Sequence, residues 1–215
     1  MRRCAVSCQA TIHPSEPLPL FTLSQAHAAF AIDGSGQFQD QLRAALTMLA
    51  RSNDPAIKQL HAQLESAAGV VTFRQMTDDR ATWSNDGDPT RGHIEPSGGG
   101  PKHDGRTSPT DATIYIPQTA VDPGSERWRS GLLVHELVHG LDLATGRYNP
   151  DYRVRERRAV FLQNIWRERT GFPLRTSYHG AFPTMDYQYA KSVGLTASYL
   201  EYIFRRSDFP GPRPK

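Results

Sequence analysis

Three residues in the stretch LLVHELVHGLD have the types and the spacing that could hold a metal ion: His135, Glu136 and His139. On a helix, side chains four residues apart project from one face about one turn apart, so both imidazoles could reach the same ion. Zinc accepts imidazole nitrogens at about 2.0–2.1 Å, which such a pair allows. Glu136 would lie about 100° round the helix, where its carboxylate could take a proton from a water that the ion has made acidic. The motif therefore predicts a zinc site that activates water.

The residues around this motif are apolar, which predicts a helix buried on most of its faces. They are Leu132, Leu133, Val134, Leu137, Val138 and Leu141. The alternative is a buried helix whose two histidines are satisfied by hydrogen bonds alone. Burying a His-Glu-x-x-His pattern without a charge to pair with is costly, however, so the sequence favours the metal site.

A catalytic zinc needs a third protein ligand and one open position. Glu156 is the favoured candidate, because it lies on the next predicted helix, and Gly146 and Pro150 let that helix fold back. The alternative for Glu156 is a surface glutamate paired with an arginine. Asp142 is interpreted as a carboxylate that orients an imidazole, or else as a solvent-facing acid near the helix end. His179 ranks lower as a ligand, because its surroundings predict a loop.

Donors for a developing oxyanion are a second requirement of peptide hydrolysis, and a positioned Tyr, His or Arg often supplies one. The first candidates are Arg175 and Tyr178, three residues apart in PLRTSYHG. Tyr187 and Tyr189 are weaker candidates. For each of these residues, ordinary packing or a surface ion pair is the alternative interpretation.

The elements that must position these residues follow from the hydrophobic periodicity. Two amphipathic helices are predicted first, one of about 14 residues beginning near Phe38 and one beginning after Asp54. β-Branched and aromatic residues predict strands at 69–76 and 112–118, the second at a sheet edge because of Pro117. Further helices are predicted at about 125–145, 152–169 and 195–206. The class is α+β, a compact zincin-like domain with a small sheet, an HExxH helix and a following helix with a Glu ligand.

Composition divides the chain into a leader at residues 1–33 and a catalytic domain at 34–215. The leader is rich in Ser, Pro, Gln and His and predicts a mobile segment. Within the domain, residues 77–111 predict a long polar loop, either a flap over the substrate or an insertion. Cys4 and Cys8 are the only cysteines of the sequence, which excludes a disulfide framework and a four-cysteine zinc site.

Charge and hydropathy argue against several other classes of protein. No apolar run is long enough for a membrane span, and none follows the basic start as a general secretory signal would require. The net charge is only +3, but six arginines crowd residues 153–169. If they line a cleft, they would favour acidic or phosphorylated segments; the alternative is a solvated helix face. Nucleic-acid binding is a poor fit, because stacking aromatics and known binding motifs are missing.

The order of the motifs resembles that of the NleD-like family of type III secreted effector zinc metalloproteases. The resemblance covers about residues 31–190 and lies in four segments: AIDGSGQFQDQLRAAL, ATIYIPQ, VHELVHGLD and ERRAVFLQNIWRERTGFPLRTSY. It implies one Zn²⁺ per chain, held by His135, His139 and Glu156, with Glu136 as the general base. It also implies delivery by a bacterial type III system into the host cell cytoplasm. The implied substrate is a mitogen-activated protein kinase, cut in its activation loop.

The sequence is compatible with three functions. The first is a monomeric zinc endopeptidase that hydrolyses a peptide bond in a host protein. The second is a non-catalytic, zinc-stabilised effector that binds a host partner; Glu136 argues against it, because a structural zinc site has no use for a base. The third and weakest is a metal-dependent hydrolase of small molecules.

Overall fold

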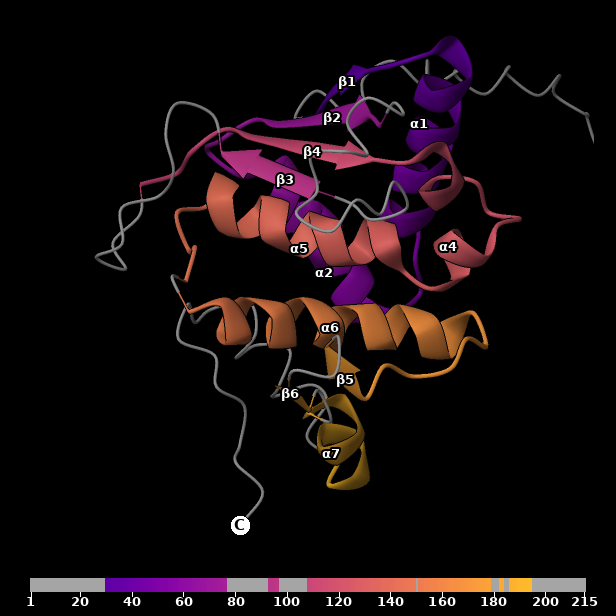
Figure 1. The fold of residues 1–215 in the computed structure, drawn as a ribbon, viewed down its shortest axis with the longest axis vertical. Helices are drawn as coiled ribbons and strands as arrows, with labels where there is room; N and C mark the ends of the chain where they lie inside the picture. Colours follow the sequence, from indigo (N-terminus) through magenta and orange to yellow (C-terminus); the bar gives the residue numbers. More distant parts are fainter. Residues whose placement is uncertain are drawn as a thin grey trace, which may run out of the picture.

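Helix α5 packs against a small sheet in the computed structural model of the chain, and α6 packs against α5 on the side away from the sheet (Figure 1). The structure describes residues 30–76, 93–96, 108–149, 151–178, 182–183 and 186–194. The helical elements are α1 (Gly36–Ala50), α2 (Pro55–Glu65), η2 (Gln118–Ala120), α4 (Glu126–Arg129), α5 (Leu132–Ala144), α6 (Tyr152–Arg169) and α7 (Asp186–Ser192). The strands are β1 (Phe30–Asp33), β2 (Val71–Gln75), β3 (His93–Pro96), β4 (Ala112–Ile116), β5 (Ser177–Tyr178) and β6 (Phe182–Pro183). This combination of helices with a small sheet agrees with the predicted α+β class.

The main sheet has the strand order β1-β2-β4-β3, in which β1, β2 and β4 are parallel and β3 is antiparallel to β4. β4 is therefore an inner strand, and the prediction that Pro117 marks an edge strand is wrong. The strand ends at Ile116, so Pro117 lies just past the ladder, where its missing N–H removes no ladder hydrogen bond.

Two strands of this sheet were not predicted. β1 occupies the last residues assigned to the leader, and β3 lies within the predicted loop 77–111. Each is four residues long, which is too short for a clear alternating pattern. The rest of the predicted leader and most of the loop lie outside the described residues.

The two predicted N-terminal helices are confirmed as α1 and α2. The Ser35 hydroxyl caps α1 by accepting a hydrogen bond from the Phe38 N–H. The Asp54 carboxylate caps α2 by accepting from the N–H groups of Ala56 and Ile57. Both caps satisfy N–H groups that a helix end leaves without partners.

The single helix predicted at 125–145 is instead two helices, α4 and α5, separated by a turn at Gly131. Gly131 has a φ of 74°, in the left-handed region that favours glycine. A side chain there would also crowd α6, because a Cβ on Gly131 would lie 3.1 Å from Trp166 Cδ1. Helix α5 begins after this break, with the two histidines on the side that faces Glu156 of α6.

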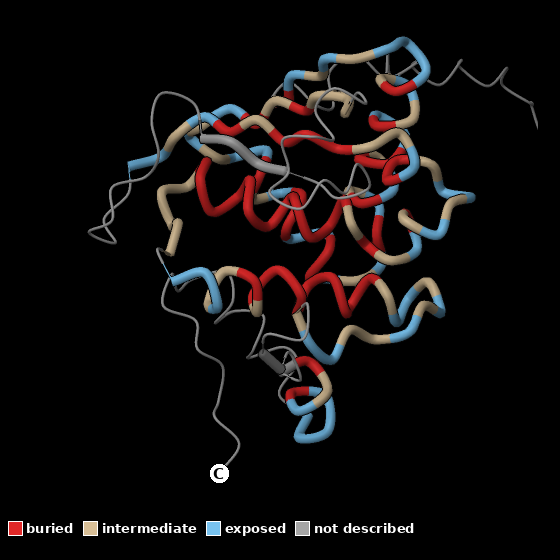
Figure 2. Tube along the Cα trace, viewed as in Figure 1, coloured by how far each residue is buried: buried red, intermediate tan, exposed pale blue. Residues whose placement is uncertain are grey.

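Helix α5 is buried on every face from Leu133 to Ala144 (Figure 2). Gly140 allows its close approach to the sheet, because a Cβ at this position would lie 3.0 Å from Ile114 Cδ1 of β4. A helix wedged between a sheet and another helix has little freedom to shift, since protein interiors are densely packed. The backbone that presents His135 and His139 is therefore fixed from both sides.

The C-terminal part differs from the sequence expectation. Helix α7 (Asp186–Ser192) was not predicted, and the helix predicted at about 195–206 lies outside the described residues. Glu168 of α6 holds α7 by accepting hydrogen bonds from the Tyr187 hydroxyl and the Lys191 ammonium group. Within the described ranges, no helix has both the length and the apolar character needed to cross a membrane.

Candidate metal centre

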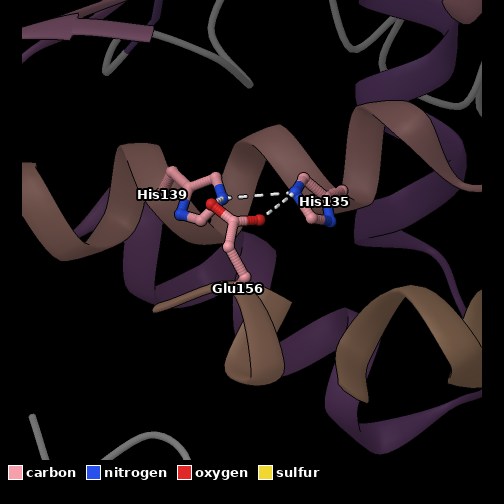
Figure 3. A group of neighbouring side chains, drawn as sticks. All are labelled: His135, His139 and Glu156. Atoms are coloured by element: carbon pink, nitrogen blue, oxygen red, sulfur yellow. Dashed lines mark hydrogen bonds and ion pairs between the residues drawn. The ribbon is translucent and has the colours of Figure 1, made fainter. Parts of the chain in front are cut away.

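His135 and His139 project from α5 toward Glu156, which projects from the facing helix α6 (Figure 3). The Nε2 atoms of the two histidines are 3.2 Å apart. Glu156 Oε2 lies 3.1 Å from His135 Nε2, and Glu156 Oε1 lies 3.4 Å from His139 Nε2. The structure thus brings together the three residues that the sequence predicts as metal ligands.

These separations fit a tetrahedral metal ion. Ligand atoms about 2.0–2.1 Å from a tetrahedral ion lie about 3.3–3.4 Å from one another, close to the three separations above. Two imidazoles and a carboxylate are also donor types that zinc binds. Over the described part of the chain, this is the one group of His, Cys, Asp or Glu residues whose ligand atoms converge in this way, all within 4.8 Å of one another. The residues present therefore fit a metal ion held by three protein ligands.

The electrostatics of the group also favour a cation. Burial works to raise the pKa of Glu156, but the adjacent imidazoles, His139 first, outweigh it and lower the pKa. Burial likewise works to lower the pKa of His139, and the Glu156 carboxylate overcomes it and raises that pKa. The carboxylate thus favours positive charge at this point, whether a proton or a metal ion supplies it.

Glu136 follows His135 on α5 and is 6% exposed. Its carboxylate lies close enough to His139 to act on the charge of that imidazole. A buried carboxylate beside a metal site can accept a proton from a water in the site, provided that it does not itself bind the ion. Glu136 lies outside the converging group of three, which meets that condition.

Asp142 lies one helical turn beyond His139, and its carboxylate pairs with the Arg158 guanidinium of α6 at 2.5 Å. Both side chains are almost inaccessible, at 1% and 2% exposed. Burial raises the pKa of Asp142, and the Arg158 charge opposes that shift. The pair joins α5 to α6 at a position two residues along α6 from Glu156, and Asp142 is not solvent-facing. Orientation of an imidazole by Asp142 stays a prediction.

Tyr178 lies beside the metal ligands, and Arg175 lies beside Tyr178. The Tyr178 ring stacks on His135, with ring centroids 6.1 Å apart and an interplanar angle of 8°. Burial, together with the nearby Glu156 carboxylate, raises the pKa of Tyr178, so its hydroxyl keeps its proton at neutral pH. Arg175 Cζ lies 4.5 Å from the centroid of the Tyr178 ring. Tyr178 is therefore next to a metal ligand, whereas the Arg175 guanidinium contacts the Tyr178 ring, Gln163 and Ser177.

The weaker candidates for the oxyanion donor both lie on α7. The Tyr187 hydroxyl donates to Glu168, twelve residues along α6 from Glu156, which the helix rise converts to about 18 Å. Tyr189 is 37% exposed on α7. The weaker candidate for the third ligand, His179, lies outside the described residues.

A buried group of two histidines and a glutamate, with a second glutamate beside it, is the type of centre at which metal-dependent hydrolases work. Residues 26–174 match the family model Peptidase_M91, which is described as an effector protein, and this range is well over half of the 215 residues. The chain belongs to this family of effector peptidases, which confirms the resemblance seen in the sequence. No curated protein and no solved structure matched the chain.

Sequence reasoning missed two features of this centre. The sequence places Arg158 among six arginines that line a cleft or form a solvated helix face, whereas it is buried against Asp142. Asn164, whose side chain is 1% exposed, was given no role. No local pattern marks either residue, because the partner of each is distant in sequence or lies on a neighbouring segment.

Proposed function

We propose that this protein is a zinc-dependent endopeptidase with one zinc ion per chain, acting as a monomer on a protein of a host cell. The observation that supports it most is the buried convergence of His135, His139 and Glu156 next to Glu136. Membership of an effector peptidase family supports both the hydrolysis of peptide bonds and a host protein as substrate. A zincin-like arrangement is part of the proposal, with α5 as the HExxH helix and α6 supplying the third ligand.

The mechanism assigns a separate task to each side chain. The ion would be held by His135, His139 and Glu156. Zinc, when bound, would supply a Lewis acid that acidifies water and polarises the scissile carbonyl. The Glu136 carboxylate would take a proton from the attacking water and pass it to the leaving amine. The Tyr178 hydroxyl, aided by Arg175, would donate a hydrogen bond to the developing oxyanion.

Delivery and substrate complete the proposal. Residues 1–33 would serve as the signal for a bacterial type III system, which would place the domain at 34–215 in the host cytoplasm. The substrate implied by the family resemblance is a mitogen-activated protein kinase, cut in its activation loop. The effector description of the family supports action inside a host cell.

The test compares new protein N-termini in a host-cell lysate treated with the purified full chain or with Glu136→Gln. Glutamine keeps the volume of the buried carboxylate and removes its capacity to accept a proton, so the variant should keep its zinc. The matched control is Glu126→Gln, at an exposed glutamate of α4.

We expect new termini with the wild type and the control, none with Glu136→Gln, and none after chelation of zinc. Identical termini from all samples, with zinc bound at one per chain, would contradict catalysis and favour a non-catalytic, zinc-stabilised binder of a host partner. Cleavage that persists in Glu136→Gln would refute the role of this residue as the base.

A further inference from the structure

Asn164 of α6 holds the chain segment that follows this helix by two hydrogen bonds to one residue. The Arg175 N–H donates to Asn164 Oδ1 at 2.8 Å, and Asn164 Nδ2 donates to the Arg175 carbonyl at 2.9 Å. A side-chain amide paired in this way with both backbone groups fixes a residue much as a neighbouring strand would. Because Asn164 is 1% exposed, water does not readily replace these bonds.

The adjacent residue, Gln163, extends this attachment to the start of α5. Gln163 Nε2 donates to the Ser130 carbonyl at 2.8 Å, just before the turn at Gly131. Its Oε1 accepts from Arg175 Nη1 at 3.3 Å. Two neighbouring side chains of α6 therefore connect the Arg175 segment with the backbone that begins the metal-binding helix.

The segment relies on such bonds, because burial fixes it only in part, through Leu174 packed against the core. None of residues 172–178 is fully buried. Arg167 holds the beginning of the segment, since its Nε donates to the Pro173 carbonyl at 2.6 Å. Asn164 holds Arg175, three residues before Tyr178, whose ring lies at 6.1 Å from that of His135.

We propose that Asn164 is a positioning residue, which places the Tyr178 hydroxyl at the metal centre by fixing the backbone of Arg175. The proposal rests on the function proposed above, because it gives Tyr178 a task in catalysis. Displacement of a catalytic group by about 1 Å can cost about 10²-fold in rate. Loss of this attachment should therefore lower turnover while the three metal ligands on α5 and α6 stay in place.

The first test measures the attachment itself and requires no substrate. Hydrogen–deuterium exchange is compared between the full-length wild type, Asn164→Ala and Asn164→Asp, each with and without zinc. Asn164→Asp keeps an acceptor for the Arg175 N–H but sets a carboxylate against the Arg175 carbonyl. We expect exchange in residues 172–178 to accelerate about tenfold in both variants, with α5 unchanged and zinc affinity within about twofold of the wild type. Unchanged exchange in 172–178 would overturn the proposal.

The second test is a double-mutant cycle with Tyr178→Phe, using a peptide that spans the bond mapped by the comparison of N-termini. Tyr178→Phe should lower kcat about 10²-fold. Asn164→Ala should lower kcat about 10-fold with KM within about twofold, and should add less than about twofold in the Tyr178→Phe background. An equal loss in both backgrounds would overturn the proposal, because Asn164 would then act on the fold in general. A Tyr178→Phe variant with full activity would overturn it as well.

A control separates positioning from loss of stability. Ile165→Val removes one methylene from the buried neighbour of Asn164, which should lower the melting temperature without changing kcat or the exchange of 172–178. The outcomes also separate the two proposals. Failure of the zinc peptidase appears as an absence of cleavage by the wild type, whereas failure of the Asn164 attachment appears in the exchange data of a protein that still cleaves.

Discussion

Breaking the buried ion pair between Asp142 and Arg158 should destabilise the protein far more than its single contact suggests. The two side chains are 1% and 2% exposed and lie 2.5 Å apart, so each charge depends on the other. Arg158→Met fills a similar volume and leaves the Asp142 carboxylate buried without its partner. Removing one member of a buried pair costs about 3–5 kcal/mol. At about 2–4 °C per kcal/mol for a chain of this size, the melting temperature should fall by about 6–20 °C.

The double variant Asp142→Leu/Arg158→Met should recover most of this loss. Burial raises the pKa of Asp142 even with Arg158 present, so the carboxylate is disfavoured in its charged form by folding. Replacement of a buried pair by apolar groups is for that reason often neutral or stabilising. The unfolding free energy of the single variant should also rise on acidification. A carboxyl whose folded pKa is raised destabilises the fold above that pKa, and the penalty disappears below its unfolded pKa of about 3.9.

The assay is denaturant unfolding of metal-free protein at several pH values, with the exposed pair Arg43–Asp40 as control. Its side chains are 52% and 84% exposed, and Arg43→Met should change the unfolding free energy by less than about 1 kcal/mol. A loss below about 1 kcal/mol for Arg158→Met would refute the reasoning. So would a double variant as unstable as the single one, because both results would mean that the charges do not depend on each other.

Three further outcomes follow from the packing and the contacts. Gly140→Ala should lower both thermal stability and zinc affinity, measured by calorimetry and metal titration, because its Cβ would press on Ile114 at 3.0 Å and push α5 from the sheet; normal zinc affinity would contradict this. Tyr178→Phe should keep zinc at wild-type affinity, because the hydroxyl is not a proposed ligand. Glu168→Gln should loosen α7, seen as faster proteolysis at 186–194, because Tyr187 and Lys191 lose a charged acceptor. These partners lower the pKa of Glu168, so the wild-type contact should persist at neutral pH and weaken as the pH falls through that pKa.

The sequence was most informative where chemistry and periodicity are local. The four-residue spacing of His135 and His139 requires only a helix, and the apolar flanks require its burial, so both could be inferred without a structure. Glu156 could be proposed as a ligand because the next helix was predicted and Glu156 is the only acidic residue in residues 153–167. The α+β class followed in the same way from a few periodic segments.

Other features depend on contacts between distant parts of the chain. The break at Gly131 lies against Trp166 of α6, and a periodic apolar run gives no sign of it. The inner position of β4 depends on β3, a four-residue strand inside a polar segment. The partners of Asp142 and Asn164 become evident only when α6 lies against α5 and the Arg175 segment lies against α6.

The central claim is that His135, His139 and Glu156 together hold one zinc ion. The most direct measurement is zinc stoichiometry and affinity, by metal analysis and competition titration, for the wild type, His139→Ala, Glu156→Gln and the control Glu126→Gln. We expect one tightly bound zinc per chain in the wild type and the control. Each ligand variant should bind zinc at least about 10-fold more weakly. Wild-type affinity in both His139→Ala and Glu156→Gln would contradict the claim, because the ion would then be held elsewhere.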